Sequence, residues 1–425
     1  MAKLYTFDSG LKLLYEVNNI NKSTSIEIGF DCGARCDGEN AGLSHFCEHM
    51  FFTGTDKLSK QEVSKRYFDF IRANAYTSNT DIVFNGTIIT SKLASYLRCV
   101  QDMICNSNFN TIAVEEEKKV VIQEIVRDAD QHSRHADRLR KYELYKLEYF
   151  NNGVLGSKES VSKIASKDVK NYVKKYFVKN NCIISICTPL SFNKVKKIIK
   201  NNFDNIMPSN KLKPLLNDSD KLVDEESVKI YHKAIDKNFV SVIFKSNRKG
   251  PDLKYRVLLG TISNLIDDIS DGLTKELRLD KGLVYGMWDE YMINKVNSYL
   301  ELYTEISSQN IKPCLDTIFD YVNKLVDKGF TKQQFNKELE KDEYYWQTRV
   351  ERPENIVSRL TRHRFYDKFV SDKDVHDEVQ RLTLEEVNKA MRELFKNAKI
   401  QVFVYGDAQK TDVYSIKQLL KKFNT

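Results

Sequence analysis

The stretch DVKNYVKKYFVKNNCIISICTP, residues 168–189, decides the fold, because its pattern returns as EVNKAMRELFKNAKIQVFVYGD at residues 386–407. The two segments align at a constant offset of 218 residues, which matches Phe177 with Phe395. In each copy a helical spacing of apolar residues leads into an apolar, β-branched run, so each is predicted to form a helix followed by a strand. A repeat of this length indicates a duplicated domain and not a solenoid unit.

The repeat divides the 425 residues into two similar α+β halves, each expected to hold a largely antiparallel sheet packed against helices. We predict a first domain at residues 1–207 and a second at 228–425. The segment between them, residues 208–227, reads PSNKLKPLLNDSDKLVDEES and holds two of the six prolines. A polar, proline-containing stretch of this kind is typical of a linker.

Composition excludes several classes of protein. With 41% hydrophobic and 30% charged residues, the chain is too apolar to be disordered and too charged for a membrane protein. The net charge of +8 comes largely from lysines spaced along helical patterns, which indicates solvated helix faces and no nucleic-acid partner. Eight cysteines without a framework spacing are expected to be reduced thiols. The N-terminal residues alternate like a strand and lack the apolar block of a secretion signal, so a cytoplasmic location is predicted.

One short motif carries candidate chemistry: HFCEH at residues 45–49, within GLSHFCEHMFFTGT at residues 42–55. A helix turns about 100° per residue, so His45 and His49 lie on adjacent turns of one face, with Glu48 about 60° to the side of His45. Two imidazoles at this spacing can bind one zinc ion, and the carboxylate between them can hold a water molecule. HxxEH is the reverse of HExxH and is typical of inverzincins. The alternative is an amphipathic helix that carries histidines by chance.

A catalytic zinc site needs a third protein ligand. In the helical segment that begins at Thr111, the residues Glu117, Val121, Glu124 and Asp128 fall within one narrow stripe. An inward carboxylate is costly to bury unless it is paired or bound to a metal. Because apolar residues flank Glu124 on both sides, we interpret it as the third ligand, whereas Glu115 and Glu116 are expected to face water.

At this point the sequence resembles the pitrilysin or insulinase-like zinc peptidases, which include the mitochondrial processing peptidases. The resemblance covers nearly the whole chain. It depends on GLSHFCEHMFFTGT, on EKKVVIQE, whose last residue lies 75 residues beyond the second histidine, and on LRLDKGLVYG at residues 277–286. It implies the fold of one half of a clamshell peptidase, with a zinc-binding catalytic first domain and a metal-free second domain.

The resemblance also implies roles for the residues of the metal site. His45, His49 and Glu124 would bind one zinc ion per chain, and Glu48 would be the general base. Glu117, seven residues before the last ligand, would support the site as a further member of the catalytic set.

A second group of residues matches the parts of the family that hold the substrate. Arg278 and Tyr285 match an arginine and a tyrosine that family members direct at the bound substrate, and both complete the catalytic set. Asn74 and Ala75 match the strand beside the scissile bond. The glycines that usually precede this strand are replaced by Ile and Arg at residues 71–72.

These residues together predict a zinc-dependent endopeptidase that cleaves unfolded peptides inside an enclosed chamber. Two alternatives stay open: a non-catalytic structural subunit of a larger complex with the same fold, and a zinc ion that serves folding alone. Since a clamshell of four domains would need two such chains, the resemblance implies a homodimer, or a heterodimer with a related subunit.

Overall fold

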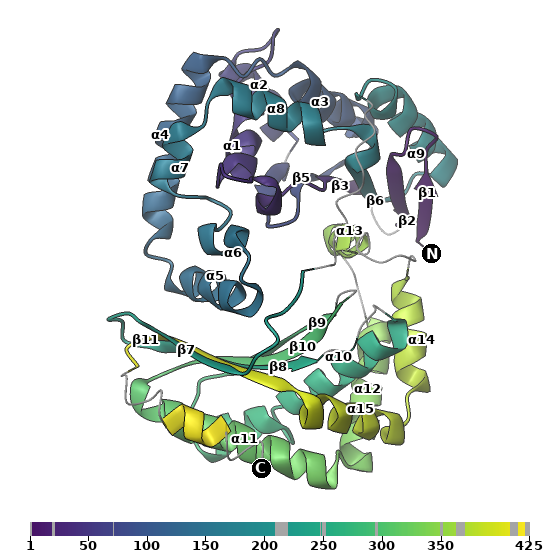
Figure 1. Ribbon diagram of the computed structural model, residues 1–425. Helices are drawn as coiled ribbons and strands as arrows, with labels where there is room; N and C mark the ends of the chain where they lie inside the picture. The colour runs from purple at the N-terminus through teal and green to yellow at the C-terminus, as the bar shows by residue number, and fades with distance from the viewer. Residues whose placement is uncertain are drawn as a thin grey trace. The chain divides into compact units, whose positions relative to one another are not determined.

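The computed structural model describes residues 2–18, 22–70, 72–208, 220–246, 248, 252–293, 296–348, 352–362, 370–408 and 415–420. Contacts within the chain divide it into two compact units. Unit 1 comprises Met1–His132, Leu147–Leu216 and Val350–Phe369, and unit 2 comprises Ser133–Lys146, Asn217–Arg349 and Val370–Thr425. Each unit packs helices against one sheet (Figure 1), which confirms the predicted α+β fold class with two similar domains.

The sheet of unit 1 has six strands in the order β1-β2-β6-β3-β5-β4. Its strands are β1 (Lys3–Thr6), β2 (Lys12–Val17), β3 (Ser23–Phe30), β4 (Asn74–Thr77), β5 (Ile82–Ile89) and β6 (Cys182–Thr188). Neighbours run antiparallel, except that β2 and β6 are parallel. The short strand β4 pairs with β5 along one side and forms an edge of the sheet.

The sheet of unit 2 repeats this arrangement in the order β7-β11-β8-β10-β9. Its strands are β7 (Ser227–His232), β8 (Asn238–Ser246), β9 (Met287–Ile293), β10 (Ser298–Ile306) and β11 (Lys399–Gly406). The parallel pair here is β7 with β11, and β11 is antiparallel to β8. The two strands recognised from the repeat, β6 and β11, therefore hold the same place, each between one parallel and one antiparallel neighbour, as a duplication requires.

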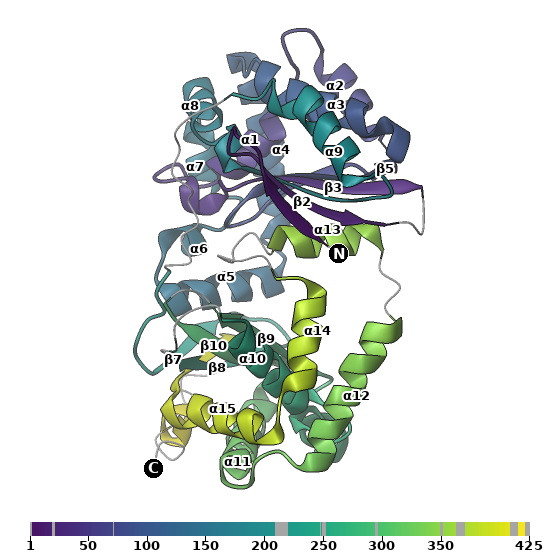
Figure 2. The same ribbon diagram turned by 90° about the vertical axis from the view of Figure 1, so that its right-hand side faces the viewer.

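Helices cover both faces of the first sheet. Unit 1 contains α1 (Leu43–Met50), α2 (Lys60–Phe68), α3 (Leu93–Asn106), α4 (Thr111–Asp128), α6 (Glu148–Asn152), α7 (Lys158–Lys163), α8 (Ser166–Tyr176), α9 (Phe192–Ile199) and α13 (Pro353–Arg362), with short turns η1 (Ala34–Cys36), η2 (Thr90–Lys92), η3 (Lys179–Asn181) and η4 (Lys200–Asp204). Phe46 and Phe51 from the region of α1 pack with Phe84 and Phe177 in the main core. On the opposite face α13 covers the sheet, with Val357 packed in a separate apolar cluster (Figure 2).

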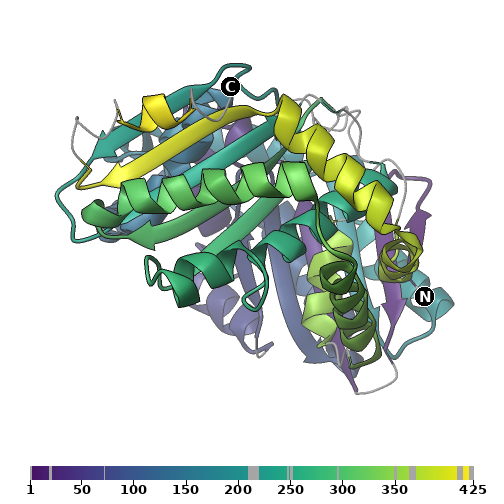
Figure 3. The ribbon, with the colours of Figure 1, turned by 90° about the horizontal axis from the view of Figure 1, so that it is seen from below.

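The second sheet is covered in the same way. Unit 2 contains α5 (His132–Tyr145), α10 (Leu253–Asp267), α11 (Ile311–Lys328), α12 (Lys332–Thr348), α14 (Asp372–Arg381) and α15 (Leu384–Asn397), with η5 (Lys275–Asp280) and η6 (Ser308–Asn310). Figure 3 shows α11 and α15 lying across one face, where Val402 and Val404 of β11 join the core. The alternate residues Phe403 and Tyr405 point to the other face and pack against Ala136 of α5. Within the described ranges, no helix is long and apolar enough to cross a membrane.

The two units exchange one helix each. Helix α5 belongs to the first half of the sequence and packs in unit 2, whereas α13 belongs to the second half and packs in unit 1. The physical reason is that each sheet has a second apolar face that needs cover. The domains predicted at 1–207 and 228–425 are contiguous in sequence and so place α5 in the first domain and α13 in the second. Most of the predicted linker, residues 209–219, lies outside the described residues.

Candidate metal centre

The helix that carries HFCEH begins at a tightly packed turn. Gly42, its N-cap residue, has a φ of 89°, in the left-handed region that favours glycine. A Cβ atom at Gly42 would lie 2.5 Å from the carbonyl oxygen of Leu155, so a side chain has no room there. The buried carboxylate of Asp37 accepts hydrogen bonds of 2.8 Å from the backbone N–H groups of Gly42 and Ser44. These contacts fix the start of α1 and with it the direction of its side chains.

The structure brings together the three residues predicted as ligands. Oε2 of Glu124, on α4, lies 3.7 Å from Nε2 of His45 and 3.5 Å from Nε2 of His49. The three ligand atoms lie within 4.8 Å of one another, and they form the single group of this kind among the described residues. Zinc bonds of about 2.1 Å in a tetrahedral arrangement place neighbouring ligand atoms about 3.4 Å apart. Two nitrogens and one carboxylate oxygen at this spacing fit a zinc ion with one position left open.

The two histidines differ in protonation because their neighbours differ. Burial and the adjacent His49 lower the pKa of His45 to about 4, so His45 is neutral at physiological pH. Burial also disfavours charge on His49, but its hydrogen bonds to Glu117 and Glu124 outweigh burial and raise the pKa of His49 to about 9. The hydrogen bond to His49 lowers the pKa of Glu124. A metal ion at this site would therefore displace a proton from His49 and meet an ionised Glu124.

Glu48 lies on the same helix, between the two histidines in sequence. Its Oε2 accepts a hydrogen bond of 2.6 Å from Oγ1 of Thr77, the last residue of β4. Burial raises the pKa of Glu48, and the bond from Thr77 opposes this shift. A carboxylate with a raised pKa is a stronger proton acceptor, which suits the role of general base predicted for it.

Glu117 lies behind His49, two helical turns before Glu124 on α4. Its Oε1 is 2.9 Å from Nδ1 of His49, and its Oε2 accepts a hydrogen bond of 2.7 Å from Nζ of Lys60. Burial works against the ionised form of Glu117, but these two hydrogen bonds lower its pKa. Neither Lys60 nor Thr77 was predicted from the sequence, because neither belongs to the spacing that identified the ligands.

The strand predicted to lie beside the substrate is the edge strand β4. Asn74 and Ala75 pair with Asn85 and Phe84 of β5, so the opposite side of β4 carries no strand in the described structure. Arg72, just before this strand, has a φ of 70°. It therefore adopts a left-handed conformation that glycine adopts more readily than arginine. Residue 71 lies outside the described residues.

Arg278 and Tyr285 belong to unit 2, whereas the metal ligands belong to unit 1. Arg278 lies on the π-helical turn η5, and Tyr285 lies in the loop that leads into β9. The guanidinium carbon of Arg278 is 5.1 Å from the centre of the Tyr285 ring, and Tyr285 is 82% exposed. The structure thus brings these two predicted residues together as an accessible pair of hydrogen-bond donors.

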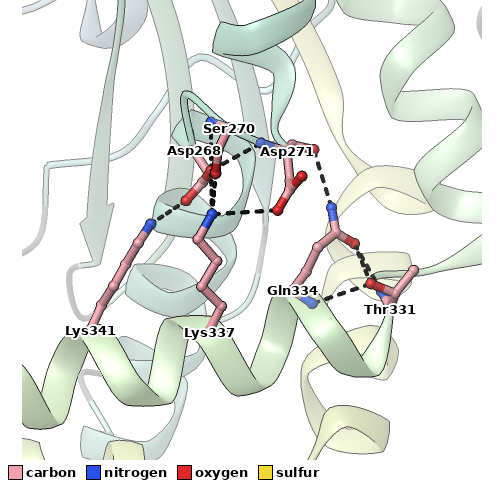
Figure 4. Close-up of polar contacts among 7 residues, drawn as sticks. All are labelled: Asp268, Ser270, Asp271, Thr331, Gln334, Lys337 and Lys341. Atoms are coloured by element: carbon pink, nitrogen blue, oxygen red, sulfur yellow. Dashed lines mark hydrogen bonds and ion pairs between the residues drawn. The ribbon is translucent and has the colours of Figure 1, made fainter.

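The loop before η5 is tied to helix α12 (Figure 4). Asp268 forms ion pairs with both Lys337 and Lys341, and Lys337 also lies 3.4 Å from Asp271. Gln334 donates a hydrogen bond of 3.2 Å to the backbone carbonyl of Asp271. Several bonds between one loop and one helix fix the point from which the turn carrying Arg278 starts.

Two family models match most of the chain. The model described as insulinase (peptidase family M16) matches residues 12–158, and the model described as peptidase M16 inactive domain matches residues 163–341. A Bacillus subtilis protein named uncharacterized zinc protease YmxG is 24% identical over 93% of this chain and 96% of its own length. A Helicobacter pylori protein named non-peptidase homolog YmxG is 23% identical over 88% of this chain and 87% of its own.

A solved structure shows the same fold over a longer chain. The periplasmic protease PqqL from Escherichia coli superposes with a TM-score of 0.83 at 15% sequence identity. The match covers 100% of this chain and 50% of the PqqL chain. The present chain therefore has the fold of one half of that protein.

Proposed function

The chain belongs to the insulinase family of peptidases, family M16, and we propose that it is a zinc-dependent endopeptidase acting on unfolded peptides. The observation that carries this proposal is the convergence of His45, His49 and Glu124 beside the partly buried carboxylate of Glu48. A merely amphipathic helix would not need two imidazoles and a carboxylate directed at one point.

In this proposal His45, His49 and Glu124 hold the zinc ion. Zinc in such a site supplies a Lewis acid that polarises a peptide carbonyl and lowers the pKa of a water molecule. Glu48 takes a proton from the attacking water and later delivers it to the nitrogen of the leaving amine. Thr77 holds the Glu48 carboxylate in place while it exchanges this proton.

The proposed substrate is an extended peptide that adds to the edge strand β4. Strand addition uses backbone hydrogen bonds, so it accepts many sequences but requires an unfolded segment. Thr77 links β4 directly to Glu48, and a peptide aligned along Asn74 and Ala75 would therefore pass beside the proposed base. Folded proteins are expected to be poor substrates for the same reason.

We further propose that two chains assemble into the active enzyme. The chain corresponds to half of the PqqL chain, so a second copy or a related subunit would supply the other half. In such a dimer Arg278 and Tyr285 of one chain would donate hydrogen bonds to a substrate bound at the metal centre of its partner. Both residues are exposed to solvent, as this role demands.

The test is to purify the protein without chelator, measure its zinc content, and incubate it with an unfolded peptide and with a folded protein. We expect about one zinc per chain and cleavage of the peptide alone. Since one relative is named a non-peptidase homolog, the competing function is that of a structural subunit. A zinc content far below one per chain, together with no cleavage, would favour that alternative.

A further inference from the structure

A chain of three polar side chains leads away from the metal centre to the protein surface. Glu117, whose side chain is 7% exposed, uses one carboxylate oxygen for His49 and the other for Lys60. Lys60 has a side chain that is 51% exposed, so its ammonium group also meets solvent. Lys60 thus places an ammonium group 2.7 Å from the buried carboxylate of Glu117.

Local structure holds Lys60 at this point. Ser59 caps α2 in a capping box with Glu62, which makes Lys60 the first residue of the helix. Just before it, the backbone of Gly54 pairs with that of Ser59, and Thr55 N–H donates a hydrogen bond of 2.9 Å to the carbonyl of Leu58. The loop that follows the HFCEH helix therefore returns to place a lysine behind the second histidine.

The first position of a helix is electrostatically unfavourable for a lysine such as Lys60. The N-terminus of a helix carries partial positive charge and favours acidic residues. The ion pair with Glu117 is the contact that compensates Lys60 for this position. Lys60 therefore occupies a position that the helix N-terminus disfavours and forms an ion pair with Glu117 there. A residue that breaks a local rule in this way is a candidate for a role beyond folding.

The two histidines are not supported equally. Nδ1 of His49 is hydrogen-bonded to Glu117, whereas Nδ1 of His45 is buried without a hydrogen-bond partner in the described structure. When Nε2 of a histidine binds a metal, the partner at Nδ1 fixes the tautomer and the orientation of the ring. Within the described residues, Glu117 is therefore the only group that forms a hydrogen bond with Nδ1 of either histidine ligand.

We propose that Lys60 is a positioning residue for the metal ligand His49 and acts through Glu117. Lys60 holds the second oxygen of Glu117, so that the first oxygen stays aligned with Nδ1–H of His49 and Nε2 stays directed at the metal. The inference rests on the proposed zinc function, and it adds a cation to the residues that determine metal affinity.

The experiment measures the Kd for zinc by competition with a chromophoric chelator in four forms of the full-length protein: wild type, Lys60→Met, Lys60→Arg and Lys65→Met. Methionine keeps the length of the apolar stem without the charge, and arginine restores the charge. Lys65 is an exposed lysine on the same helix and serves as the matched control. Circular dichroism of each variant verifies that it is folded.

We expect Lys60→Met to weaken zinc binding by roughly 10-fold to 100-fold, the usual effect of losing a group that supports a ligand. Lys60→Arg should recover most of the affinity, and Lys65→Met should bind as wild type does. In a Glu117→Gln background the Lys60→Met change should have little further effect, because the two residues act in series.

Two results would overturn the inference while leaving the proposed function intact. One is a Lys60→Met protein that binds zinc within twofold of wild type. The other is an equal loss of affinity in the Glu117→Gln background, which would mean that Lys60 does not act through Glu117. If wild type itself binds no zinc, the proposed function fails first, so the two failures are distinguishable.

Discussion

Thr77 donates a hydrogen bond of 2.6 Å from Oγ1 to Oε2 of Glu48 and thereby joins the edge strand β4 to the helix that carries both histidines. A peptide aligned along the strand would be held at a fixed distance from the carboxylate.

Glu48→Gln should retain zinc and lose activity by roughly 10²-fold to 10⁴-fold, because the ligands remain while the base is gone. Glutamine has nearly the shape of glutamate and still accepts the bond from Thr77, so binding of an unfolded peptide should be unchanged. Zinc analysis and a peptide-cleavage assay on the same preparation check both parts. Near-full turnover by this variant would contradict the proposed mechanism.

Removal of a metal ligand should abolish zinc binding as well as activity. We expect His49→Ala and Glu124→Ala each to lose the metal, and with it the activity, while the protein remains folded. Glu116→Ala is the matched control, since Glu116 lies on the same helix as Glu124 but is exposed to solvent. It should keep both zinc and activity. Loss of zinc from the control, or retention by both ligand variants, would argue for a different metal site.

Chelation should leave the fold intact. Each unit has its own large apolar core, and the metal ligands contribute to neither core. We expect the far-ultraviolet circular dichroism of the zinc-free protein to match that of the zinc-loaded protein. The thermal midpoint should rise on adding zinc, because a ligand bound to the native state alone stabilises it. A zinc-free chain that unfolds would instead identify the ion as a structural one.

Mixing two inactive variants tests the proposed homodimer. Glu48→Gln lacks the base, and the double variant Arg278→Ala, Tyr285→Phe lacks the pair in unit 2. In a mixed dimer with sites shared between chains, one site carries both lesions and the other carries none. Random exchange of equal amounts should restore about a quarter of the wild-type sites.

A tag on one variant confirms that the subunits exchange. If exchange is complete and the mixture stays inactive, the active site does not combine these residues from two copies of this chain. A related subunit would then be the partner to seek.

The sequence by itself determined the features that depend on local spacing. A helix of fixed pitch places His45 and His49 on one face, and the same pitch places Glu117 and Glu124 two turns apart on another helix. The repeat at residues 168–189 and 386–407 likewise predicted two similar halves, and the matching places of β6 and β11 in their sheets confirm it. Backbone geometry encodes such relationships within one element, so they can be read from spacing alone.

Tertiary structure decided which distant side chains meet. Lys60 reaches Glu117 across 57 positions, and Thr77 reaches Glu48 across 29, and no periodicity links either pair. The exchange of α5 and α13 between the units is of the same kind, because any amphipathic helix can cover an apolar sheet face. Which helix covers which face, and which cation meets a buried carboxylate, depends on the packing of the whole chain, since that packing alone brings distant positions within contact distance.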